Sequence, residues 1–141
     1  MSSTEQNPAP LSRPTRVTAA AAVAGLEALA LFAGGLYVLV STLTGTPDGV
    51  TQALMGAATL IALGLIPLLA ARGLLRLRSW SRGPAAITHI MALPVAWTLL
   101  NAEAAAIPVG IALAAAAVTG LVLLVHPTTT RALGIGRTTD A

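Results

Sequence analysis

The sequence contains no cysteine and very little charge. The absence of cysteine from all 141 residues excludes disulfide bonds, cysteine nucleophiles and thiolate metal sites. Only 9% of the residues are charged, whereas a soluble domain usually has about 25%. With so few charged side chains the chain cannot cover a surface that faces water, and the alternative solvent is lipid.

Lysine is also absent, so all eight basic residues are arginines. Together with the abundance of alanine, this is typical of a GC-rich bacterial genome. The sequence pI of about 11.2 reflects the excess of arginines over acidic residues. A high pI alone does not indicate nucleic-acid binding, and we expect no nucleic-acid partner because the arginines lie between and beside apolar runs.

Long apolar runs dominate what the sequence does contain. The chain is 55% hydrophobic, with a mean hydropathy of +0.81, and a helix needs roughly 20 mostly apolar residues to span a bilayer. Strands are a poor alternative, because no period-2 alternation is sustained and four strands cannot close a barrel. The sequence therefore predicts an all-α, membrane-spanning four-helix bundle. The predicted helices cover about 17–40, 50–71, 84–100 and 104–125.

The connections between the runs are short and differ in character. The first, STLTGTPDG, is rich in turn residues, and the second, RGLLRLRSWSRG, is rich in arginine. The third, NAEA at 101–104, is so short that the last two helices should form a tight antiparallel hairpin. Pro108 falls in the first turn of the fourth helix, where its missing N–H is tolerated.

The arginines predict the orientation of the bundle. In a four-helix serpentine every arginine falls on one side, while Asp48 and Glu103 fall on the other. The positive-inside rule makes the arginine side cytoplasmic, which predicts a bacterial inner-membrane protein with both termini inside (N-in/C-in). The arginines before, between and after the runs are Arg13, Arg16, Arg72, Arg76, Arg78, Arg82, Arg131 and Arg137.

Two tails flank the predicted helices. Residues 1–16 are polar and contain prolines, so we expect a disordered cytoplasmic tail. Residues 126–141 should form a short, mobile cytoplasmic tail. The first apolar run is longer than the 7 to 15 residues of a signal-peptide core, so we expect this helix to be retained.

Small residues at helical spacing predict how the helices pack, since lipid removes the hydrophobic drive for their association. Packing within the bundle is the simpler interpretation, and a seam between copies of the chain is the alternative. The predicted ladders are Thr88, Ala92 and Ala96 in the third helix, Ala112, Ala116 and Gly120 in the fourth, and the pairs Ala21–Gly25 and Ala30–Gly34 in the first.

One segment resembles a known group of proteins. Trp80-Ser-Arg-Gly-Pro84, followed by Leu93-Pro-Val-Ala-Trp97, precedes an alanine-rich last helix and a short arginine-bearing tail. This arrangement, over about residues 17–135, resembles small four-helix integral membrane proteins of actinobacteria. The resemblance implies a membrane location and a four-helix architecture, and it assigns no activity and no catalytic residue.

Glu27 is a carboxyl group inside the first apolar run, VAGLEALALFAGG. It lies about 15 Å into its helix at 1.5 Å per residue, where a charged side chain costs a few kcal/mol on insertion scales. Burial favours the protonated form, which can donate a hydrogen bond. Its predicted partners are the hydroxyl of Thr59 and the backbone carbonyls of Leu63 and Ile90. Pro67 and Pro94 leave these two carbonyls without their helical hydrogen bonds. Glu27 should therefore tie the first helix to a neighbour.

A proton or cation site is the alternative interpretation of Glu27. Small multidrug exporters resemble this chain in architecture alone, with four short helices and a glutamate in the first. His89 and Trp97 are further candidates, His89 as a proton relay and Trp97 for stacking on a cation. Leu93 and Trp97 are predicted to share the face of His89. His89 should nevertheless lie about 7 Å nearer the cytoplasm than Glu27, which favours a histidine bonded within the bundle.

None of the remaining polar features indicates a catalytic site. His126 should cap the fourth helix as a cation, and the arginine-rich loop should set the topology. Alternatively, its arginines bind anionic lipid phosphates, an interaction that salt would weaken, or the loop docks a protein partner. No phosphate loop, paired carboxylates or catalytic triad is present, so we expect no enzyme, no metal and no cofactor.

The predicted function is that of a structural or accessory membrane protein, acting through helix packing with itself or a membrane-protein partner in the lipid bilayer. The alternative is a proton-linked carrier of small solutes that uses Glu27. Replacing Glu27 with glutamine separates the two, because an amide can substitute for a neutral hydrogen-bonding acid but cannot bind and release a proton.

Overall fold

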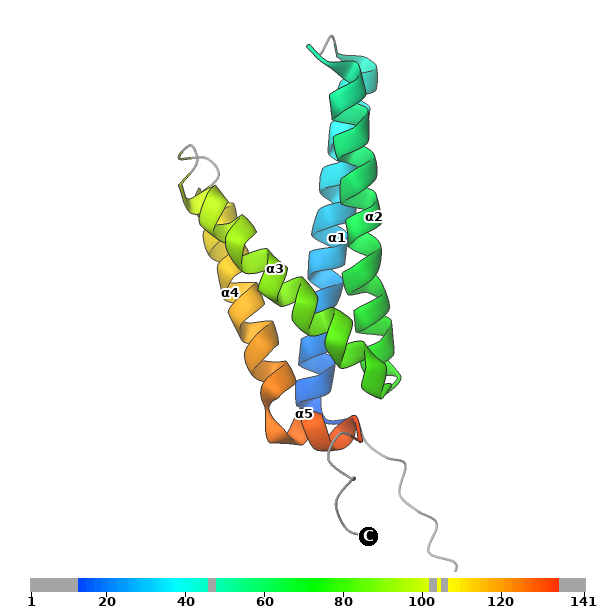
Figure 1. The fold of residues 1–141 in the computed structure, drawn as a ribbon, viewed down its shortest axis with the longest axis vertical. Helices are drawn as coiled ribbons and strands as arrows, with labels where there is room; N and C mark the ends of the chain where they lie inside the picture. Colours follow the sequence, from blue (N-terminus) through cyan, green and yellow to red (C-terminus); the bar gives the residue numbers. More distant parts are fainter. Residues whose placement is uncertain (1–12, 46–47, 102–103, 105–106, 135–141) are drawn as a thin grey trace, which may run out of the picture.

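The computed structural model describes residues 13–45, 48–101, 104 and 107–134, and most of these residues are helical (Figure 1). Four helices are long and apolar enough to cross a membrane, which confirms the predicted all-α class and the predicted number of helices able to span a membrane. The elements are α1 (Thr15–Thr44), α2 (Val50–Leu75), the 3-10 helix η1 (Ser79–Ser81), α3 (Arg82–Leu100), α4 (Ile107–Val125) and α5 (Pro127–Ala132).

Several predictions fall outside these residues. They concern the first twelve residues of the N-terminal tail, Pro47 in the first connection, Glu103 in the third, and Arg137 with the last residues of the C-terminal tail. The fourth helix begins at Ile107 and not at residue 104. Pro108 is its second residue, so the predicted place of this proline in the first turn is confirmed.

The four long helices form two hairpins of unequal length. At 1.5 Å per residue, the 30 residues of α1 and the 26 of α2 make helices of about 45 and 39 Å. The 19 residues of α3 and of α4 make helices of about 28 Å each. The hydrocarbon core of a bilayer is about 30 Å thick. The second hairpin therefore matches the membrane, and the first is long enough to extend beyond it or to tilt.

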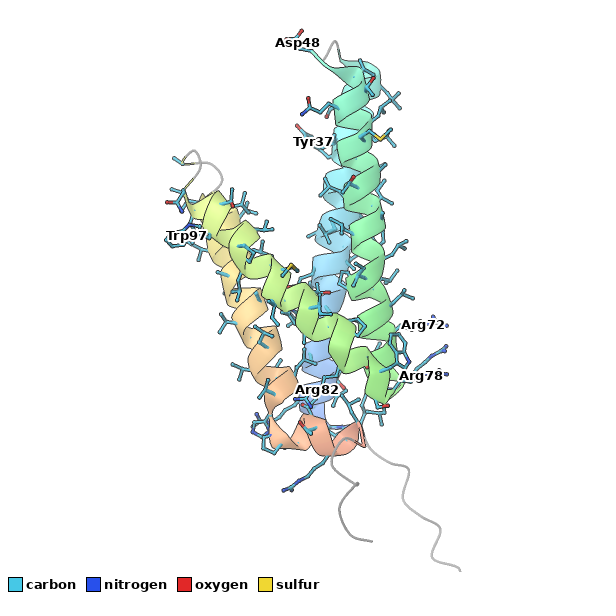
Figure 2. All side chains as sticks on the ribbon, viewed as in Figure 1. Tyr37, Asp48, Arg72, Arg78, Arg82 and Trp97 are labelled. Atoms are coloured by element: carbon cyan, nitrogen blue, oxygen red, sulfur yellow. The ribbon has the colours of Figure 1, made fainter. Side chains whose placement is uncertain are left out.

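The hairpins meet at one end of the molecule and diverge toward the other (Figure 1). Each helix packs mainly on its hairpin partner, and the contacts between hairpins are fewer. The end where they meet is called the arginine end here, because Figure 2 places Arg72, Arg78 and Arg82 there and Asp48 at the opposite end. The starts of α1 and α5 lie at the same end.

The buried cluster that joins the hairpins also lies at the arginine end. It draws on all four long helices and on the residue that follows α5, so this is where the fold gains most of its packing between hairpins. Its side chains are small or medium in size, which lets the helix backbones approach closely. The members are Val17, Ala20, Ala21, Ala70, Leu74, Ala85, Leu124 and Leu133.

The buried residues of each helix form one stripe, in which steps of three, four and seven positions predominate, as they do in left-handed helix packing. This pattern corrects part of the predicted ladders. Ala30 and Ala112 are exposed, and Gly25 has no atom near its side-chain position, whereas Ala92, Ala96 and Gly120 are buried as predicted. The buried positions are Val17, Ala20, Ala21, Ala24, Glu27, Ala28, Gly35 and Thr42 in α1, Ala57, Gly64, Pro67, Ala70, Ala71, Gly73 and Leu74 in α2, Ala85, His89, Ala92 and Ala96 in α3, and Gly110, Ala117, Gly120 and Leu124 in α4.

The segment after α4 is more ordered than the sequence predicts. Residues 127–132 form α5, and Leu133 is buried in the cluster. The buried Thr129 hydroxyl donates to the carbonyl of Leu123 at 2.6 Å, which ties α5 to α4. His126 precedes α5, and its Nδ1 accepts a hydrogen bond from the backbone N–H of Thr128 at 3.2 Å. Its ring therefore caps the start of α5.

Candidate functional site

Two polar side chains meet in the interior of the bundle and connect its two hairpins. Glu27 of α1 and His89 of α3 are 62 residues apart in sequence, and their Oε1 and Nδ1 atoms are 3.0 Å apart. Glu27 is 8% exposed and His89 is 0% exposed. The pair is the only one of opposite ionisable type within bonding distance among the described residues. It is called the Glu27–His89 pair below.

Small residues make room for this pair. Glu27 lies between Ala24 and Ala28 on the buried face of α1, and His89 lies between Ala85 and Ala92 on the buried face of α3. Alanine side chains leave space for longer polar side chains between two closely packed helices. Both polar residues thus occupy packing positions, where a leucine or alanine would otherwise be expected.

Gly120 of α4 forms the third wall of the site. A Cβ atom added at Gly120 would lie 2.6 Å or less from three atoms of the His89 ring, so only glycine leaves space for the imidazole. The sequence predicts Gly120 as a small packing residue and gives no signal that it faces His89. The ring is therefore held between a carboxyl group on one helix and a bare backbone on another.

Two atoms of the site have no hydrogen-bond partner among the described residues. They are Glu27 Oε2 and His89 Nε2, both buried. A buried polar atom without a partner costs about 1–3 kcal/mol, so the site has capacity for a further proton. The pair shares a proton in either of two ways, because an imidazole N–H donates to a carboxylate or a protonated carboxyl donates to the ring.

The predicted partners of Glu27 are wrong. The hydroxyl of Thr59 donates instead to the carbonyl of Met55 in its own helix, at 2.8 Å, as hydroxyls commonly do in apolar surroundings. Glu27 bonds neither Leu63 nor Ile90 within the described residues, and His89 takes their place. The expectation that Glu27 bonds a neighbouring helix is confirmed, and so is a histidine bonded within the bundle.

The side chains of Glu27 and His89 meet although the sequence places His89 about 7 Å nearer the cytoplasm. Ala85, in the first turn of α3, belongs to the same buried cluster as Val17 and Ala21 of α1. The first turns of the two helices therefore lie at the same end of the molecule. Figure 1 shows α1 extending further at the arginine end, beside α5.

Trp97 does not belong to the site. Its side chain is 70% exposed and lies toward the far end of α3 (Figure 2). The prediction that Leu93 and Trp97 share the face of His89 is wrong for a geometric reason. At 100° per residue, a position eight residues on is turned by about 80°, whereas one seven residues on is turned by about 20°. Ala96, seven residues after His89, is accordingly the buried one.

The arrangement supports proton binding and helix–helix linkage, and it lacks the ligands of a metal centre. No group of three or more His, Cys, Asp or Glu side chains that could hold a metal ion occurs in the described part of the chain. Comparison of the chain with protein-family models, with curated proteins and with solved structures finds no match.

Proposed function

We propose that this protein is a multi-pass protein of the bacterial inner membrane with a structural or accessory role, acting through helix packing with itself or a membrane-protein partner. In this proposal it is one of the small four-helix actinobacterial membrane proteins that its sequence resembles, and it performs no catalysis. The observation that supports the proposal most directly is the Glu27–His89 hydrogen bond, which ties together two hairpins that otherwise share few contacts.

The burial of the pair favours a tie over a transport site. His89 is fully buried, and its ring lies against Gly120, so a solute reaches the pair only if the hairpins separate. The outward faces of both hairpins are covered by large apolar side chains such as Leu29, Ile66 and Val118. Such faces suit lipid or the helices of another membrane protein.

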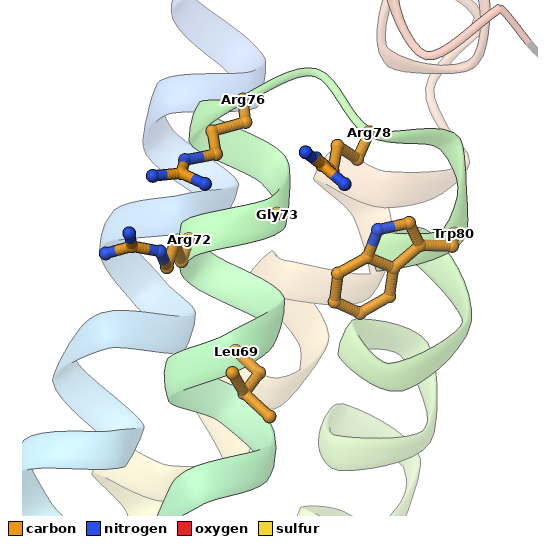
Figure 3. Close-up of a pocket in the computed structure, with 6 residues that line it drawn as sticks. All are labelled: Leu69, Arg72, Gly73, Arg76, Arg78 and Trp80. Carbon is orange, nitrogen blue, oxygen red and sulfur yellow. The ribbon is translucent and has the colours of Figure 1, made fainter.

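The proposed orientation places the arginine end in the cytoplasm. All arginines of the described residues belong to segments at that end, and Asp48 lies at the other (Figure 2). Tyr37 and Trp97 are exposed toward the Asp48 end, and Trp80 is exposed beside Arg78 at the arginine end (Figure 3). Amphipathic aromatic residues concentrate at the two membrane interfaces, which supports a membrane lying between these levels.

Single cysteines test this orientation, because the natural chain contains none. Asp48 and Ser79 are exposed at opposite ends, so Asp48→Cys and Ser79→Cys serve as matched reporters. We expect a membrane-impermeant maleimide to label the Asp48→Cys variant in intact cells and the Ser79→Cys variant only after the cells are opened. Labelling of the Ser79→Cys variant alone in intact cells would reverse the proposed orientation.

A proton-linked carrier is the second candidate function, and the two unpartnered atoms of the site favour it. Glu27 Oε2 and His89 Nε2 are buried acceptors or donors without a partner in the described residues, and together they can accept or release a proton. In that case Glu27 titrates during transport, and the hairpins open and close around it.

Glu27→Gln separates the two functions. The accessory role predicts that the variant folds and forms the same chemically cross-linked assemblies in native membranes as the natural chain, since an amide still bonds His89. Proteoliposomes loaded with a pH-sensitive dye provide the second measurement. A proton flux present in the natural chain and lost in Glu27→Gln, with no assembly in either, would rule out the accessory role and support the carrier.

A further inference from the structure

A small cleft at the arginine end lies away from the Glu27–His89 pair. It has a volume of about 190 Å³ and lies between the last turns of α2 and the 3-10 helix η1 (Figure 3). Three arginines and a tryptophan dominate its walls. The lining residues are Leu69, Arg72, Gly73, Arg76, Arg78 and Trp80.

A tight turn at the end of α2 builds one side of this cleft. The backbone N–H of Arg78 donates to the carbonyl of Gly73 at 3.0 Å, and the N–H of Leu77 donates to Leu74 at 3.0 Å. Leu77 has a φ of 52°. These two bonds and a left-handed residue define a Schellman motif, which usually uses glycine at the left-handed position. The turn reverses the chain and brings Arg78 back beside the end of the helix.

Gly73 and Ser81 fix the other side. A Cβ atom added at Gly73 would lie 2.5 Å from the Cβ of Ser81, so glycine allows η1 to pack directly on α2. Ser81 is fully buried, and its hydroxyl donates to the carbonyl of Arg78 at 2.6 Å. The backbone that presents Arg78 and Trp80 is therefore held by hydrogen bonds and close packing before any ligand arrives.

The cleft combines positive charge with an apolar wall. No carboxylate lies within bonding distance of Arg72, Arg76 or Arg78 within the described residues, where the Glu27–His89 pair is the one contact between side chains of opposite ionisable type. Leu69 lies one turn further into α2 than Arg72, and the indole of Trp80 faces the cleft beside the guanidinium of Arg78 (Figure 3). The lining thus changes from charged to apolar along α2, in the direction that leads from the membrane surface into the lipid.

A phospholipid headgroup presents the same change of polarity at the same level of the membrane. Its phosphate accepts hydrogen bonds from guanidinium groups, which match phosphate geometry, and its glycerol and acyl carbons pack on leucine and tryptophan. We propose that this cleft binds the phosphate headgroup of an anionic phospholipid from the leaflet at the arginine end. The cleft selects an anionic lipid over a zwitterionic one because it offers three cations and no carboxylate.

Tryptophan fluorescence tests this proposal, because the chain has only two tryptophans. In the Trp97→Phe variant, Trp80 in the cleft is the only tryptophan, so all tryptophan fluorescence comes from the cleft. The protein is placed in phosphatidylcholine vesicles that contain a small fraction of a bromine-labelled lipid, which quenches tryptophan on contact. We expect labelled phosphatidylglycerol to occupy the site about fivefold or more in preference to labelled phosphatidylcholine, the factor that one basic residue contributes at an anionic surface.

Two matched double variants separate a built site from general attraction. Arg72→Gln with Arg78→Gln removes two cations from the cleft, and Arg16→Gln with Arg131→Gln removes two exposed cations from the same end outside it. The preference for phosphatidylglycerol should vanish in the first and persist in the second. An equal loss in both would show diffuse charge attraction and overturn the site.

Two further results would also overturn the proposal. Equal quenching of Trp80 by both labelled lipids in the natural arginine background would show that the cleft does not select an anionic lipid. Loss of the preference on adding millimolar inorganic phosphate, with no matching effect of sodium chloride at the same ionic strength, would make free phosphate the ligand. As a positional control, Trp80→Phe leaves Trp97, which lies toward the opposite end and should show no preference.

Discussion

Gly120→Ala is expected to destabilise the protein by about 3 kcal/mol, the sum of overpacking at about 1–3 kcal/mol and the loss of a buried hydrogen bond at about 1 kcal/mol. The added methyl group would occupy the space of the His89 imidazole. The ring cannot yield while it stays bonded to Glu27, so either the bond breaks or α4 moves away from α3. Unfolding by titration with a denaturing detergent in mixed micelles measures the change.

Gly56→Ala is the matched control for this substitution. Gly56 is also a helical glycine, but a Cβ atom there meets nothing within 4 Å. This variant should be unchanged or more stable by up to about 1 kcal/mol, since alanine favours a helix over glycine. His89→Ala in the Gly120→Ala background should restore part of the loss, because it removes the collision. Equal stability of Gly120→Ala and Gly56→Ala would show that His89 does not rest on Gly120.

Glu27→Leu is expected to have the second largest effect, a loss of about 1–3 kcal/mol. Leucine has nearly the same size as glutamate but cannot bond, so both nitrogens of the buried His89 ring are left without a partner. Glu27→Gln keeps a bonding group and should lose less than about 1 kcal/mol, in the range measured for hydrogen bonds between membrane helices. The same detergent titration measures both variants.

His126→Gln controls for the loss of a histidine that does not link the hairpins. Among the described residues, its ring bonds the backbone N–H of Thr128 at the start of α5 and nothing else, so the change should be well under about 1 kcal/mol. In a His126→Gln background, the ¹⁵N signals of the single remaining histidine report directly on the pair. The signal of His89 Nδ1 should shift with Glu27→Leu and less with Glu27→Gln. Identical signals in all three proteins would mean that the pair is not bonded.

The Glu27–His89 pair links the two hairpins, because Glu27 belongs to α1 and His89 to α3. Each hairpin is held by close packing along its own length, as at Gly35, whose added Cβ would touch Ile61, and at Gly110, whose added Cβ would touch Leu99. Between the hairpins, packing is concentrated at the arginine end. The pair adds a polar link between the hairpins, further along α1 than the cluster residues. Changes in its hydrogen bonding should therefore alter the angle between the hairpins more than the internal packing of either one.

Helix positions were predictable from the sequence because they depend on local properties. Apolar runs of membrane length, the glycines around Asp48 and the arginine-rich connection mark the helices within a few residues of their observed ends. Gly49, at the start of α2, has a φ of 94°, which glycine adopts readily. The order of α5 was missed, because a six-residue helix is stable only through tertiary contacts such as those of Thr129 and Leu133.

The packing faces were only partly predictable. A ladder of small residues every four positions drifts around the helix, whereas the observed buried stripe also uses steps of three and seven. From Ala21, a step of three reaches Ala24, which is buried, and the predicted step of four reaches Gly25, which is half-buried. In an alanine-rich chain both spacings are present, so the sequence alone does not identify the face.

The sequence by itself determined that this chain forms four helices able to cross a membrane, with its arginines gathered in alternate connections, because hydropathy and charge are read segment by segment. Only the tertiary structure decided that Glu27 meets His89, that the His89 ring lies against Gly120, and that three arginines and Trp80 line one cleft. These contacts depend on where each helix begins relative to its neighbours and on the rotation of each about its axis. No single segment encodes either quantity, since both arise when all the helices pack together.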